Sequence, residues 1–204
     1  AVKNLTLKQV TVTGGSRVGA AVGWAQVALD KENMSGSVAG LIGNVHVTGS
    51  VTGDDQTGGI AGVNGGEEAR KTGFSAANAL DRCSFEGSVI GNTVTGGVAG
   101  RNEGTVTSSF AAGVVDTSEN GKIAGGAIGS NEGSVYDSFA DAAVCGNSSI
   151  GGFVGSGLGM IQRCYSLGDV SGANDIGGFA GSISYVDTAV SAGKVSISGR
   201  QDQG

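Results

Sequence analysis

The stretch GGVAGRNEGTV, from Gly96 to Val106, returns as GGAIGSNEGSV at Gly125–Val135 and as GGFVGSGLGMI at Gly151–Ile161. Its first part, G-G/A-x-x-G, begins at positions 19, 58, 96, 125, 151 and 177. A glycine-rich phrase can bind phosphate, but such a loop needs G-K-[ST] or the N-terminus of a helix behind it. Neither feature follows the phrase in this sequence. A single phosphate-binding site would also not require so many copies of the phrase. We therefore interpret the phrase as part of a repeated fold.

Two further columns of residues recur at fixed distances from the phrase. The first column is apolar: Ile42, Leu80, Val106, Val135, Ile161 and Val186. The second column is always valine: Val51, Val89, Val115, Val144, Val170 and Val195. Nine residues separate the two columns in every repeat, and seven lead from the valine to the next phrase, except for ten after Val115. Such a constant spacing indicates a structural repeat.

The variable distance lies in one place only, between the third glycine of the phrase and the apolar column. It is 19, 18, 6, 6, 6 and 5 residues in successive repeats. The first two repeats therefore carry insertions, Ala25–Gly36 and Asn64–Ala77, at a shared position. Insertions confined to one position are typical of stacked coils with loops at one edge.

The composition favours strands over helices. The chain has 41 glycines, no proline and 39% hydrophobic residues, and its segments between turns are short and rich in Val, Thr and Ile. Glycine is unfavourable inside helices, whereas such segments are typical of strands. We predict an all-β fold, a β-solenoid (β-helix) of about six coils with about 26 residues per basic coil, forming a single domain over residues 1–204. Because the chain opens without Met and ends within the pattern, we expect it to be a piece of a larger protein.

Several classes of function are disfavoured by the sequence. The net charge of −6 gives no basic stripe for nucleic acid, and no run of 18 apolar residues predicts a membrane span. The lone histidine, His46, cannot supply a zinc site of the H-E-x-x-H type. We interpret the acidic pairs Asp54–Asp55 and Glu67–Glu68 as a solvated edge rather than a calcium or catalytic cluster. We expect no cofactor, no metal and no catalytic residue.

Other columns predict ladders of stacked side chains. Asn64, Asn102 and Asn131 share a column, so their amides are expected to form a hydrogen-bonded ladder. The N-E-G turns are expected to use asparagine and glycine for a positive φ. Phe110, Phe139 and Tyr165 share another column, which predicts a packed ladder or, as the alternative, a stacking platform for a ligand.

The cysteines are expected to remain unpaired. Cys83 and Cys164 share an inward column of small residues but lie three coils apart, at roughly 14 Å by strand spacing. That exceeds the ~7 Å reach between the Cα atoms of a disulfide. Cys145 is expected to point outward or to lie in a turn, so we predict no disulfide.

The insertions are the main surface that does not repeat, and rigid scaffolds commonly carry binding sites on such loops. The candidate binding residues are Trp24, Asp30, Lys31, Glu32, Asn33, Glu67, Glu68, Arg70 and Lys71. Trp24 stands at the root of the first insertion and is expected to anchor it. The alternative is that the insertions cap the first coils or contact a preceding domain.

The repeat as a whole resembles the GLUG motif, G-G-[hydrophobic]-x-G-x-N-x-G-x-[IV]-x-x-[CS]-[FY]-x-x-G-x-V-x-G. The best matches are Gly96–Val115, Gly125–Val144 and Gly151–Gly172, with CYSLGDVSG especially close. The first two repeats depart from it through their insertions. GLUG repeats occur in large secreted or wall-anchored bacterial proteins, including IgA1-specific zinc metallopeptidases and adhesin-like surface proteins.

The resemblance implies a non-catalytic scaffold or binding region of a secreted or bacterial cell-surface protein. Its expected partners are a protein or glycan at the host surface, or neighbouring domains of the parent chain. No catalytic residue of the peptidases can be carried over, because H-E-x-x-H is absent from the sequence. The alternatives are an adhesin stalk or a carbohydrate-binding or polysaccharide-active β-helix.

Overall fold

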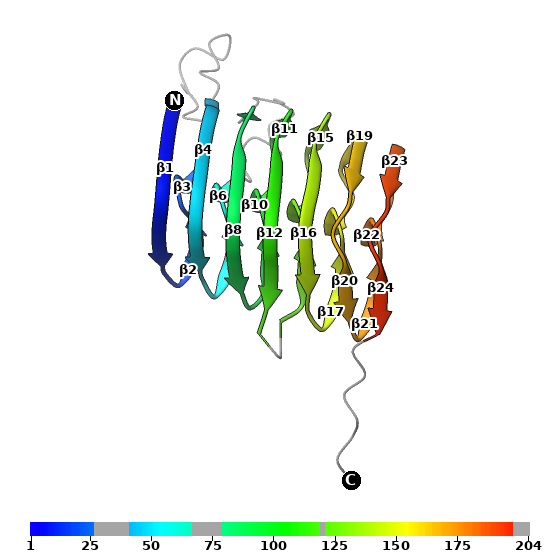
Figure 1. Cartoon of the computed structure of the whole chain (residues 1–204). Helices are drawn as coiled ribbons and strands as arrows, with labels where there is room; N and C mark the ends of the chain where they lie inside the picture. Colours follow the sequence, from blue (N-terminus) through cyan, green and yellow to red (C-terminus); the bar gives the residue numbers. More distant parts are fainter. Residues whose placement is uncertain (27–40, 67–78, 119–120, 198–204) are drawn as a thin grey trace.

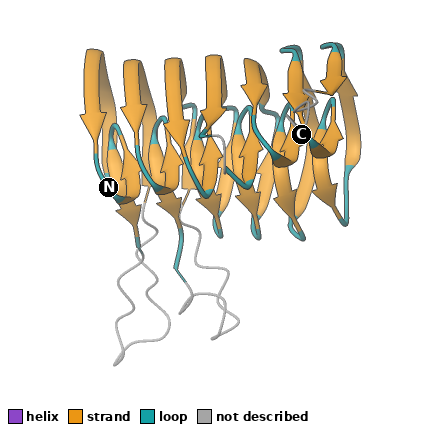
Figure 2. Cartoon of the chain, turned by 90° about the horizontal axis from the view of Figure 1, so that it is seen from below, coloured by secondary structure: helices purple, strands orange, loops and turns teal. Residues whose placement is uncertain are grey.

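The computed structural model describes residues 1–26, 41–66, 79–118 and 121–197, and these residues form a parallel β-solenoid. Its coils stand side by side in one row, from β1 (Val2–Thr13) at one end to β23 (Asp187–Ser191) and β24 (Val195–Ile197) at the other (Figure 1). Among the described residues, short loops join successive strands (Figure 2). The predicted fold class is therefore confirmed.

The described strands form three parallel sheets. The large sheet contains, besides those three strands, β4 (Leu41–Thr52), β7 (Ala79–Asp81), β8 (Ser84–Gly91), β11 (Thr105–Thr107), β12 (Phe110–Thr117), β15 (Ser134–Tyr136), β16 (Phe139–Cys145), β19 (Met160–Ser166) and β20 (Val170–Gly172). The first narrow sheet contains β2 (Ser16–Gly19), β5 (Asp55–Gly58), β9 (Val94–Gly96), β13 (Ile123–Gly125), β17 (Ser148–Gly151) and β21 (Asn174–Gly177). The second narrow sheet contains β3 (Val22–Ala25), β6 (Ala61–Asn64), β10 (Ala99–Asn102), β14 (Ile128–Asn131), β18 (Val154–Gly157) and β22 (Ala180–Ile183).

The columns predicted from the spacing are in register in the large sheet. The valine column pairs from Val12 through Val51 and Val89 to Val195. The apolar column pairs from Ile42 to Ile161. Both columns point inward, and their central members are at most 3% exposed. Stacking identical apolar positions buries a continuous core although each coil is thin.

The glycine phrase marks the seam at which the two narrow sheets meet backbone to backbone. A Cβ atom at Gly96 would collide with the carbonyl oxygen of Ala99 and lie 2.5 Å from the nitrogen of Gly129. A Cβ atom at Gly100 would lie 2.6 Å from the carbonyl carbon of Gln56. The first and third glycines are therefore required because only hydrogen atoms fit between the sheets.

The expectation that the N-E-G turns use a positive φ is wrong. Asn102 and Asn131 end strands in extended backbone, which directs their side chains into the core, and neither they nor the glycines of these turns have a positive φ. At Gly133 a Cβ atom would instead collide with the carbonyl oxygen of Gly104, so the turn needs glycine for close approach between coils.

A left-handed corner recurs in each coil at a different column. Its φ values run from 47° to 59°, at Asn4, Asn44, Arg82, Ser108, Asp137, Arg163 and Thr188. Non-glycine residues rarely adopt this conformation. Small inward side chains follow the corner: the backbone N–H of Cys83 donates to Ser109 Oγ at 3.0 Å, and Ser109 Oγ donates to the Thr107 carbonyl at 2.7 Å. The bond from Cys83 to Ser109 joins two neighbouring coils at the point where the corner interrupts the strands of the large sheet.

Candidate functional site

A groove lies beside the seam of the two narrow sheets. Its volume is about 430 Å³, within the ~300–1,000 Å³ typical of small-molecule sites. The lining residues are Arg17, Trp24, Gln26, Gln56, Val63, Gly66, Arg101 and Glu103. We call this surface the Trp24 groove.

Trp24 is held rigidly although 41% of it is exposed. It pairs with Val63 of the next coil, and its indole Nε1–H donates to the carbonyl of Gly65 at 2.8 Å. The Cζ atom of Arg17 lies 4.2 Å from the centroid of its ring, a cation–π contact. The groove therefore has one preorganised aromatic side chain with a guanidinium stacked on it.

The second cation of the groove is Arg101. Its Nε lies 2.9 Å from Oε1 of Glu103, although the Nε–H group is not aligned with that oxygen. The Glu103 side chain is only 6% exposed, so this ion pair is partly shielded from solvent. Arg17, by contrast, has no carboxylate partner in the described part of the chain, whereas Arg82 pairs with Asp81 and Arg163 with Asp137.

Of the candidate binding residues predicted from the sequence, the structure places Trp24 in the groove. The others, Asp30, Lys31, Glu32, Asn33, Glu67, Glu68, Arg70 and Lys71, lie outside the described residues. Both insertions do leave the second narrow sheet at paired positions, since Ala25 pairs with Asn64. Gln26 and Gly66, the last described residues before the gaps, line the groove.

Sequence reasoning missed Arg17, Gln56, Arg101 and Glu103. The repeat alignment contained the signal for three of them. Arg17 and Gln56 each stand two residues before a phrase, and Trp24 and Arg101 each follow its third glycine. In the first three coils these two columns beside the glycines thus mark one side of the seam.

The asparagine ladder is present as predicted. Asn64 Nδ2 donates to Asn102 Oδ1 at 2.8 Å, and Asn102 Nδ2 donates to Asn131 Oδ1 at 2.7 Å. All three residues are at most 1% exposed. At the next coil Gly157 pairs with Asn131, which ends the ladder. Its function is to satisfy buried polar groups and fix the register.

The predicted aromatic ladder is also present, on the outer face of the large sheet. The ring centroids of Phe110 and Phe139 lie 4.7 Å apart with an interplanar angle of 6°, and those of Phe139 and Tyr165 lie 5.0 Å apart with an angle of 1°. Each contact covers one face of both rings. This geometry agrees with the packed ladder, because a ligand platform needs uncovered ring faces.

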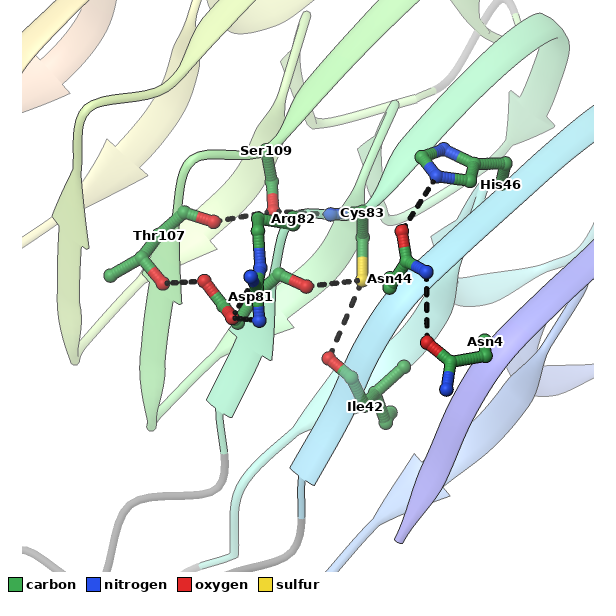
Figure 3. A network of polar contacts seen from close by, with 9 residues as sticks. All are labelled: Asn4, Ile42, Asn44, His46, Asp81, Arg82, Cys83, Thr107 and Ser109. Atoms are coloured by element: carbon green, nitrogen blue, oxygen red, sulfur yellow. Dashed lines mark hydrogen bonds and ion pairs between the residues drawn. The ribbon is translucent and has the colours of Figure 1, made fainter.

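The one histidine takes part in a polar network across the first coils (Figure 3). His46 Nδ1 lies 2.7 Å from Ser84 Oγ, and its Nε2 lies 3.1 Å from Asn44 Oδ1. Asn44 Nδ2 in turn donates to Asn4 Oδ1 at 2.8 Å. A serine, a base and an orienting amide could in principle form a nucleophilic site. Ser84 is only 5% exposed, however, because His46 and Phe110 flank it in the ladder, so its Oγ is not accessible to a substrate.

The acidic turn at Asp54 also has a structural partner. Asn92 Nδ2 donates to Asp54 Oδ1 at 2.9 Å, and Ser118 Oγ donates to Asn92 Oδ1 at 2.6 Å. Among the described residues no group of three His, Cys, Asp or Glu side chains is arranged to hold a metal ion. The same residues contain no helix long and apolar enough to cross a bilayer.

All three cysteines are free thiols, and we expect them to react very differently. Cys83 and Cys164 are at most 2% exposed, and burial raises the pKa of both, that of Cys164 to about 11. Cys145 is half-buried. With an aromatic disulfide reagent at pH 8, Cys145 should be modified quickly and the other two only after urea unfolding. Rapid native modification of Cys83 or Cys164 would contradict their inward placement.

The raised pKa of Cys164 also gives a pH dependence. The unfolded thiol ionises near its ordinary value of 9.0, whereas the folded thiol stays neutral up to about 11. Its contribution to stability is therefore complete below pH 9 and is lost as the pH rises towards 11. The free energy of unfolding in urea should fall between pH 8 and pH 10.5. This decrease should be smaller for Cys164→Ala than for the unchanged chain.

In comparisons with known proteins, no family model, no curated protein and no solved structure matches this chain significantly. The class defined by the fold is that of parallel β-solenoids, and the site adds a polar groove with one exposed tryptophan.

Proposed function

We propose that the chain is a non-catalytic binding module of a large secreted or cell-surface bacterial protein. The solenoid is the scaffold, and the Trp24 groove is the surface that contacts a glycan or protein at the host surface. The resemblance of the repeats to the GLUG motif supports this origin, with an IgA1-specific metallopeptidase or an adhesin-like protein as the parent.

The observation that carries the proposal is the position of the groove. The side chains of the repeated columns contact one another. Apolar side chains fill the core, the asparagines form hydrogen bonds with one another, and the aromatic rings stack on one another. The groove lies where the repeat is interrupted, and its arginines and glutamines extend from a rigid seam. Binding residues on a rigid scaffold lose little entropy when a ligand binds.

The polysaccharide-active alternative receives less support. Glycoside hydrolysis generally uses a pair of carboxyl groups on opposite sides of the bond to be cleaved. In the described lining of the groove, Glu103 is the one carboxylate, and Arg101 neutralises it. A contribution of residues 27–40 and 67–78 to binding stays a prediction.

The proposal is tested by retention of the purified chain on immobilised mucin and on a mammalian glycan array. We expect saturable retention, and we expect the eluted glycans to be unchanged by mass spectrometry. A chain of the same fold without the groove residues, Trp24→Ser with Arg101→Ser, is the control, because Ser130, Ser156 and Ser182 occupy the same column in later coils. Release of shortened glycans, or equal retention of the control, would contradict the proposal.

A further inference from the structure

We propose that the ligand of the Trp24 groove is a carboxylated saccharide, with Arg17 as the residue that binds its carboxylate. This inference rests on the proposed binding function and specifies its chemistry. Sialic acids and uronic acids share this chemistry, and the experiment below distinguishes them.

The first observation is the state of Arg17. Its guanidinium has a cation–π contact with Trp24 and no carboxylate partner within the described residues, in a chain of net charge −6. A guanidinium that lies over an aromatic ring keeps its N–H groups at its edge, where they can bind a carboxylate with two parallel hydrogen bonds. Trp24 is thus a positioning residue, because the bond from its indole to Gly65 fixes the ring under Arg17.

The second observation is the charge balance of the groove. Arg17 and Arg101 contribute two positive charges, and Glu103 contributes one negative charge that lies beside Arg101. Within the described lining, one positive charge, that of Arg17, therefore has no carboxylate partner. In a chain of net charge −6, this local positive charge favours an anionic ligand over a neutral or cationic one.

The third observation is the polarity of the lining. Gln26 and Gln56 extend into the groove, while the apolar residues are Trp24 and Val63, of which Val63 is only 4% exposed. Carboxamides both donate and accept hydrogen bonds, which suits the hydroxyl groups of a sugar. Among the described lining residues the one exposed apolar side chain is Trp24, and Arg17 lies over its ring, so the rest of this lining is polar.

The sequence provides a direct probe, because Trp24 is its one tryptophan. The unchanged chain is titrated with 3′-sialyllactose and with trigalacturonate while the emission of Trp24 is recorded. Lactose and the methyl ester of trigalacturonate are the uncharged counterparts. We expect a saturable change with at least one acidic probe and an affinity at least tenfold lower for its counterpart, because charge-assisted hydrogen bonds are lost. The probe that responds identifies the source of the carboxylate.

Arg17→Gln should weaken binding of the acidic probe about tenfold or more. The matched control is Arg82→Gln. Both arginines have a left-handed backbone, with φ values of 56° and 51°, and Gln56 occupies the same conformation at 53°, so glutamine is tolerated there. Arg82 lies between β7 and β8 of the large sheet and pairs with Asp81, so its replacement should leave the affinity unchanged.

Equal affinity for acidic and uncharged probes, no response of Trp24 to either acidic probe, or equal losses in the two variants would each overturn the inference. If the chain is still retained on mucin in any of these cases, the proposed binding function stands and only its assignment to a carboxylate fails. Loss of retention as well would reject both proposals.

Discussion

Replacing Gly96 by alanine should lower the free energy of unfolding by about 3 kcal/mol, the upper part of the range for overpacked sites. The new methyl group would meet the carbonyl of Ala99 and the nitrogen of Gly129, both backbone atoms. Flexible side chains can move away from an added methyl group, but these backbone atoms are held in place by the hydrogen-bond ladders within each narrow sheet. Urea denaturation followed by circular dichroism measures the change.

Gly15→Ala is the matched control for this substitution. No atom lies within 4 Å of a Cβ atom built at Gly15, and its backbone does not have a positive φ. Gly15→Ala should change the free energy of unfolding by no more than about 0.5 kcal/mol, as surface substitutions generally do. Equal effects at Gly15 and Gly96 would show that the phrase is not the point at which the sheets meet.

Replacing Asn102 by alanine should also destabilise the chain by about 3 kcal/mol, because it leaves buried polar groups of two neighbours without their bonds to Asn102. Asn102 is 0% exposed, accepts from Asn64 and donates to Asn131. The same urea denaturation measures the effect.

Asn92→Ala provides the comparison for this ladder. Asn92 is also the central member of a polar chain, between Asp54 and Ser118, but its bonds are exposed to solvent. Water replaces the lost partners there, so the cost should be about 1 kcal/mol or less. A cost at Asn92 as large as that at Asn102 would mean that burial does not decide the value of these amides.

The sequence predicted the solenoid because the spacing of its columns is a direct record of strand pairing. The valine column from Val12 to Val195, the buried asparagines and the stacked rings each need one residue type at one register position. The residue type at each position of the repeat therefore indicates where its side chain lies in the coil. The local backbone was harder to predict: the left-handed corner occupies Arg82, Ser108 and Arg163, residue types that do not indicate this conformation.

The groove could be predicted only in part. Trp24 was found because it interrupts the repeat as a large aromatic residue beside an insertion. Arg17 and Arg101 come from different coils and from different narrow sheets, and the seam glycines bring them to one surface. Both columns keep a fixed distance from the phrase, but the spacing alone does not show that the turn between β2 and β3 brings them to one surface.

The measurement that tests most directly whether function lies at this groove, rather than on the repeated columns, compares retention on mucin for two double variants. One carries Arg17→Gln and Trp24→Ser in the groove, and the other carries Phe110→Thr and Tyr165→Thr on the outer face of the large sheet, at positions that pair with Ser84 and Val190. We predict that the groove variant loses retention at least tenfold, whereas the ladder variant retains the affinity of the unchanged chain. Full retention of the groove variant together with loss in the ladder variant would contradict the assignment.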